Sequence, residues 1–158
     1  MKMPMHEIRE NTGYTANNLI TFREKATASQ LQLIMGELND YIKSTGAHRT
    51  GCIISTIHTL YMATGEVDVE VFVPLDREIP SCGKFASRGV LELDDCLATY
   101  FNGAYCFLPE FYTDIYRWAK NNKIEIEQPF YIVHARDPDA LWGMASVEAE
   151  IYVRTKES

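Results

Sequence analysis

Residues 97–122 read LATYFNGAYCFLPEFYTDIYRWAKNN and indicate a strand followed by an aromatic helix. Residues 97–101 favour a short strand, which a Gly103-Ala104-Tyr105 turn would join to a helix. Glycine allows the sharp change of direction between the two elements. Apolar side chains then recur at the spacing of one buried helical face: Leu108, Phe111, Ile115 and Trp118. The simplest interpretation is a core helix after a glycine turn.

Composition sets the outer limits on function. The chain has 158 residues, 46% of them hydrophobic, and a formal net charge of −7. This is enough material for one packed domain. An acidic chain without a run of Lys or Arg argues against direct nucleic-acid binding, whereas it suits cationic ligands.

The sequence also indicates in which cellular compartment the protein is found. The four cysteines form no CxxC pair, so we interpret them as reduced thiols. The N-terminus has no apolar signal segment, and no apolar run is long enough to span a bilayer. We therefore expect a cytoplasmic protein with no membrane contact.

The order strand, helix, strand, strand occurs twice. The first set comprises a strand at 18–24, a helix ending near residue 44, and strands at 52–58 and 66–75. The second set comprises the 97–101 strand, the aromatic helix, and strands at 129–135 and 147–154. A period near 78 residues, measured between the first strands of the two sets, is too long for a solenoid and indicates a duplicated module.

We therefore predict an α+β fold with duplicated βαββ modules related by a pseudo-twofold axis. Its antiparallel sheets would form a central ligand cleft, with the helices on the outer face. Residues 1–17 would be an N-terminal arm, and the ligand-binding domain would span 18–158. Within this domain, repeat one would cover about 18–76, a connector 77–83, and repeat two about 84–158.

Strand alternation gives candidate ligand-binding residues. If the valines of the third strand pack on a helix, Glu70 and Phe72 face the other way. The same argument turns Glu148, Glu150 and Tyr152 of the last strand away from the core. Rings and carboxylates in one cleft would suit a hydrophobic cation. The alternative is that these acids are simply the solvated face of half-exposed strands.

No pattern indicates a metal or a cofactor. His58 and His134 occupy matched positions in the two modules, but two histidines without a third ligand are a weak metal signal. The sequence has no glycine-rich phosphate loop and no nucleophile motif. We expect neither a metal nor a cofactor.

Three stretches resemble the GyrI-like, or AraC-type effector-binding, domains of bacterial multidrug-responsive regulators. The first is the Gly103-Ala104-Tyr105 turn with the helix that ends in YRWAKNN (116–122). The others are EIYV at 150–153, which is similar to the closing segment of the family, and VEVFVPL at 69–75 in the first module. The resemblance covers nearly the whole chain from about Asn18.

The resemblance implies a stand-alone bacterial ligand-binding domain with a central cleft for hydrophobic, often cationic compounds. It makes Glu150 the expected pocket carboxylate and Tyr105 an expected pocket aromatic. Trp118 is a further candidate, although its helical spacing suits a core position equally well. The family includes domains fused to DNA-binding regulators of transcription.

We thus predict a protein that senses or sequesters a hydrophobic, cationic small molecule without covalent chemistry. Two alternatives stay open at this stage. One is a hydrolase of a strained electrophile, with Glu150 as general base and Tyr105 or Tyr152 orienting the water. The other is a gyrase-interacting or other protein-interaction module. The sequence decides neither between these alternatives nor the oligomeric state.

Overall fold

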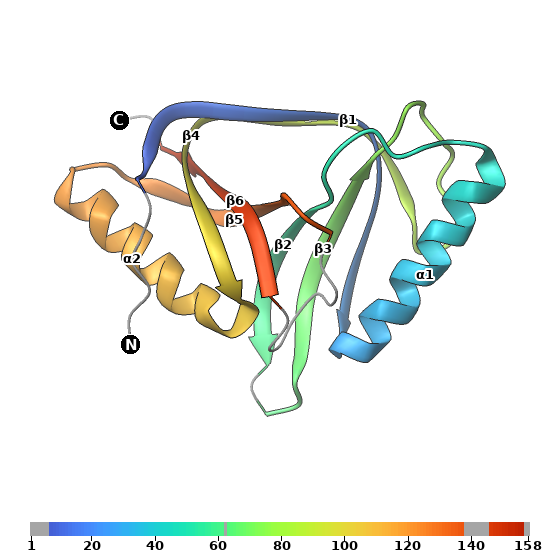
Figure 1. Cartoon of the computed structure of the whole chain (residues 1–158), viewed down its shortest axis with the longest axis horizontal. Coiled ribbons are helices and arrows are strands. Elements are labelled where there is room, and N and C mark those ends of the chain that lie inside the picture. Colours follow the sequence, from blue (N-terminus) through green and yellow to red (C-terminus); the bar gives the residue numbers. More distant parts are fainter. Residues whose placement is uncertain (1–6, 62, 138–145, 157–158) are drawn as a thin grey trace.

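A computed structural model describes residues 7–61, 63–137 and 146–156 of the chain. Across these residues the chain forms six strands, two α-helices and one 3-10 turn (Figure 1). In chain order the elements are β1 (Arg9–Ala26), α1 (Ala28–Thr45), β2 (Ile54–Tyr61), β3 (Glu66–Pro74), β4 (Ala86–Ala104), η1 (Tyr105–Phe107), α2 (Leu108–Asn121), β5 (Ile126–His134) and β6 (Ser146–Thr155). Neither helix of the described segments has the length and apolarity that crossing a bilayer requires.

The strands form one closed antiparallel barrel in the order β1-β3-β2-β5-β6-β4. Antiparallel strands and helices are both present, but the prediction of duplicated βαββ modules around a central cleft is wrong. β1 pairs with β4 along 9–21 and 86–98, and β2 pairs with β5 at Ile54 and Ser55. These two contacts merge all the strands into a single sheet. Two separate sheets facing each other do not form.

β1 and β4 are much longer than predicted, with 18 and 19 residues respectively. The strand expected at 18–24 begins at Arg9, so residues 9–17 pair in the sheet, where we had predicted a loosely held arm. Besides Asn11 (51°) near the start of β1, each strand has a residue with positive φ in its middle, at Asn18 (53°) in β1 and Asp95 (51°) in β4. Asn and Asp tolerate this conformation better than most residues, and the inward-facing alternation of each strand shifts by one residue there.

The helices pack on the outside of the barrel, at opposite ends of the molecule in Figure 1. The buried face of α1 covers the alternating valines of β3, which is the packing assumed when the candidate ligand-binding residues were assigned. Its first turn is fixed by Thr27, whose side chain accepts from the Gln30 amide in a capping box. Gly46 ends α1 in the left-handed conformation, with φ of 78°.

The second helix covers β4, β5 and β6. Its apolar face (Leu108, Phe111 and Ile115) is buried against alternate residues of those strands. We call these residues and their strand contacts the α2 cluster. Trp118 is only partly buried at its edge.

A third apolar cluster fills the barrel itself. Its members alternate with the residues that face the helices, so they point toward the barrel axis. We call it the inner cluster, and its buried members are Ala16, Leu19, Ile54, Phe72, Leu91, Leu93, Cys96, Ala98, Tyr131, Val133 and Tyr152. The inner face of the sheet is therefore the surface on which ligand-binding residues from different strands can meet.

The packing of α1 on β3 gives a direct test of the fold. Leu38→Ala removes a fully buried side chain of the helix and should lower the free energy of unfolding by about 2–5 kcal/mol, measured by urea denaturation. Leu33→Ala on the same helix is the control, because Leu33 is 71% exposed and its loss should change the free energy by less than about 0.5 kcal/mol. Equal losses for both variants would contradict the packing of α1.

Candidate functional site

β3 and β6 carry five of the predicted ligand-binding residues on the inner face. Along β6, Val147, Ala149 and Ile151 lie in the α2 cluster. The residues between and beyond them, Glu148, Glu150 and Tyr152, therefore face the barrel interior.

Along β3, the valines lie under α1, which turns Glu70 and Phe72 to the same inner face. The two strands are not neighbours, since β2 and β5 lie between them.

Aromatic rings from β1, β3, β5 and β6 form a wall on the inner face of the sheet. The Phe72 and Tyr131 ring centroids are 6.3 Å apart, and those of Tyr14 and Tyr152 are 5.7 Å apart. Phe72, Tyr131 and Tyr152 are buried, and Tyr14 packs against the cluster they belong to. The wall therefore offers apolar area together with the electron-rich faces of several rings.

The carboxylates stand at the edge of this wall. The Glu150 side chain is 35% exposed and forms an ion pair with Arg9, whose side chain is 50% exposed. On the neighbouring strand Tyr100 is directly opposite Glu150 in the ladder. Glu150 thus combines partial contact with water, a cationic partner and an adjacent phenol.

The tyrosine hydroxyls beside the carboxylates stay protonated at neutral pH. Burial, and then the Glu150 charge, raise the pKa of Tyr152 above its usual value. For Tyr100, desolvation and then a hydrogen bond with Glu148 raise the pKa. Both groups can therefore serve as hydrogen-bond donors next to the acids.

The protein's own guanidinium groups contact three parts of this lining. Arg9 pairs with Glu150. The Arg154 guanidinium carbon is 5.3 Å from the Tyr131 ring centroid, and Arg154 Nη1 donates to the Tyr131 hydroxyl at 3.2 Å. The Arg88 guanidinium carbon is likewise 5.3 Å from the Phe72 ring centroid. Rings and carboxylates of the site therefore already stabilise positive charge.

Glu70 is on the same face but has a different partner. Its Oε1 atom is 3.3 Å from His58 Nε2, and both side chains are about one-quarter exposed. Two residues earlier in β3, Asp68 accepts two hydrogen bonds from Arg23, which lower the pKa of that carboxyl. The two acids of β3 are thus held by residues of β2 and β1.

Tyr105 and Trp118 lie on the opposite side of the sheet from Glu150. Tyr105 is fully buried in η1 and belongs to the α2 cluster, and Trp118 packs at the edge of that cluster. Burial raises the pKa of Tyr105. The strands separate Tyr105 from Glu150, so these two residues do not form a catalytic pair, whereas Tyr152, the other hydroxyl of the hydrolase alternative, lies on the same face as Glu150.

Tyr105 instead has buried polar neighbours beneath α2. Its ring centroid is 6.3 Å from that of His134, whose Nε2 atom is 2.9 Å from Ser55 Oγ. Within the described part of the chain, His134 Nδ1 is buried and has no hydrogen-bond partner. A positive charge on this imidazole would be poorly solvated.

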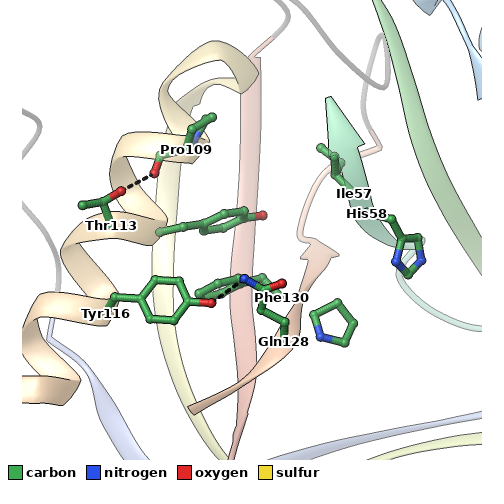
Figure 2. Close-up of a pocket in the computed structure, with 9 residues that line it drawn as sticks. Ile57, His58, Pro109, Thr113, Tyr116, Gln128 and Phe130 are labelled. Carbon is green, nitrogen blue, oxygen red and sulfur yellow. Dashed lines mark hydrogen bonds between the residues drawn. The ribbon is translucent and has the colours of Figure 1, made fainter. Parts of the chain in front are cut away.

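A groove opens on the outer side of the sheet between α2, β5 and β2. Its volume is about 450 Å³. In Figure 2, Pro109, Thr113 and Tyr116 line one wall, and Gln128 Nε2 donates to the Tyr116 hydroxyl at 2.6 Å. Tyr112 stacks on Phe130 with ring centroids 4.1 Å apart. No carboxylate lines this groove within the described residues, so it lacks the counter-charge that a cation site needs.

The sequence analysis did not identify two residues of the inner face, Tyr100 and Tyr131, and the reasons differ. Tyr100 follows Ala98 at the alternate position of β4, so the argument used for the last strand would have found it. Tyr131 stands in the uniformly apolar run PFYIV, where no polar alternation distinguishes the inner face from the outer one.

The described residues contain no group of three His, Cys, Asp or Glu side chains that could hold a metal ion. His58 is paired with Glu70, and His134 is on the α2 side of the sheet with Ser55. Among the described side chains, the inner face thus offers acids, phenols and rings as its chemistry.

Comparisons with known proteins relate the chain to others by its fold. No protein-family model matches the sequence, and no curated protein matches it. Nine chains of solved structures match. One belongs to a cryo-EM structure of an EcmrR–DNA complex, with a TM-score of 0.71 and 15% sequence identity. The match covers 96% of this chain and 57% of that chain.

This likeness shows a shared fold and nothing finer. EcmrR is a MerR-family protein whose effector-binding domain resembles the GyrI-like fold. The chain spans little more than half the length of the EcmrR chain.

His134 should couple stability to acid. Burial lowers its pKa from 6.5 to about 4, with a small opposing effect of Asp137. In the unfolded chain the imidazole protonates near its ordinary pKa, so this part of the stability is present above pH 6.5. It should be lost as the pH falls toward 4, and it amounts to about 3 kcal/mol.

Urea denaturation from pH 7 to pH 4 measures this loss. His134→Gln should flatten the acid dependence, whereas His48→Gln, which removes an exposed histidine, should not. An NMR titration of the wild-type imidazole provides a second readout that needs no variant. A His134 resonance that titrates near pH 6.5 would contradict the assignment.

Proposed function

We propose that the protein binds a hydrophobic organic cation on the inner face of its barrel. The observation that carries this proposal is the set of internal guanidinium contacts. Arg9 pairs with Glu150, and Arg154 and Arg88 lie over Tyr131 and Phe72. A surface that stabilises these charges offers the same carboxylate and ring faces to a cationic ligand.

Arg9 defines how such a ligand would enter. Its side chain is half exposed, and an exposed ion pair is worth at most about 1 kcal/mol. A cation with apolar groups would replace Arg9 at Glu150 and would cover the Tyr14 and Tyr100 side chains, which are only partly buried. The binding energy then comes from apolar burial at about 25 cal/mol per Å² together with charge pairing.

The fold likeness is consistent with this proposal. The effector-binding domain of EcmrR resembles the GyrI-like fold, the family whose motifs the sequence resembles. We propose accordingly that the chain acts as an effector-binding domain of this kind. The compound that it recognises is to be found by screening.

The proposal predicts opposite effects for the two members of the ion pair. With tetraphenylphosphonium as the probe in isothermal titration calorimetry, Glu150→Gln should weaken binding at least tenfold because the counter-charge is lost. Arg9→Gln should strengthen binding, since the internal competitor for Glu150 is removed. Glu110→Gln is the matched control, because Glu110 is an exposed acid on α2.

Three outcomes would contradict the proposal. The first is equal affinity of the Glu150→Gln variant and the wild type. The second is weaker binding after Arg9→Gln, which would make Arg9 part of the binding site. In a companion screen of cationic esters and strained electrophiles, recovery of hydrolysed products by mass spectrometry would be the third, because it would favour an enzyme.

A further inference from the structure

A cleft at the C-terminal end of α2 lies outside the barrel and away from the inner face. It has a volume of about 680 Å³. Figure 1 shows the end of α2 and the end of β6 on the same side of the molecule. The cleft is notable for its charge, since three lysines converge on it in a chain with a net charge of −7: Lys120, Lys123 and Lys156.

Backbone hydrogen bonds hold the three lysines near one another. Lys123 follows α2 with a positive φ of 59° and donates its amide to the Lys120 carbonyl at 3.1 Å. Lys156, just past β6, donates its amide to the Glu125 carbonyl at 2.9 Å. The turn after the helix and the end of the last strand are therefore tied together directly beside the cleft.

The floor of the cleft is apolar. Ala119 is buried in the α2 cluster, and Ile124 and Ile126 pack against the same cluster. Tyr116 adds a ring that is 37% exposed. An apolar ligand of moderate size would therefore find a surface to cover.

The electrostatics favour an anion. Among the described residues no ion pair involves any of the three lysines, and Glu125 is the one acid that lines the cleft. The C-terminal end of α2 contributes about half a negative charge. Glu10 lines an adjoining groove together with Lys123 and Lys156, and the three ammonium groups outweigh the two carboxylates and the helix end.

We infer that this cleft binds a small organic acid, with its carboxylate among the lysines and its apolar body on the isoleucines. Such a ligand has the charge opposite to that of the inner-face ligand, so each site can be tested with its own probe, and this inference does not rest on the proposed function. A medium-chain alkyl or aryl carboxylate matches both the apolar floor and the cationic rim.

Calorimetric titration with sodium decanoate, below its micellar concentration, tests the inference. We expect saturable binding of one decanoate per chain, and binding of decanol at least tenfold weaker because the charge is absent. The combined Lys120→Gln, Lys123→Gln and Lys156→Gln variant should weaken decanoate binding about tenfold or more. Affinity for the wild type should fall as salt is added.

The control removes the same charge elsewhere. The combined Lys25→Gln, Lys43→Gln and Lys84→Gln variant should bind decanoate like the wild type. Thermal denaturation shows whether both variants are folded. Equal binding of decanoate and decanol, equal binding by the two variants, or no saturable binding to the folded wild type would overturn the inference.

Discussion

The pairing of β1 with β4 joins the two long strands and closes the sheet into a barrel. Residues 9–21 and 86–98 form this contact, while the later parts of the same strands pair with β3 and β6. β1 and β4 therefore each pair with two neighbouring strands, and the sheet closes into a barrel. Closure gives the sheet an interior face, and α1 and α2 cover its outside.

Closure also determines which polar groups the interior must hold. The acids of β6 and β3 face inward because their apolar neighbours are needed under the helices. A carboxylate removed from water requires a partner. Glu150 has Arg9, Asp68 has Arg23 and Glu70 has His58. The positive charge of Arg9 and Arg23 is the physical basis of the proposed ligand preference.

The sequence was sufficient for features that depend on local pattern. The helix that ends near residue 44 and the alternation of β3 followed from spacing and residue type. The sequence was not sufficient where contacts between distant segments determine which strands pair and which face a residue occupies. The polar segment before Asn18 pairs in the sheet because β4 lies beside it, and nothing within 9–17 signals that partner. Tyr105 follows β4, whose residues alternate between the two faces of the sheet. The face on which Tyr105 lies depends on where α2 packs, and the local sequence does not determine this.

A crystal structure of the protein with bound tetraphenylphosphonium would show whether a cation displaces Arg9 from Glu150 inside the barrel. We expect the cation against the Tyr131 and Tyr152 rings, with Glu150 beside it and Arg9 no longer paired with that carboxylate. A complex in which the cation lies outside the barrel while the Arg9–Glu150 ion pair is intact would contradict the proposed binding site.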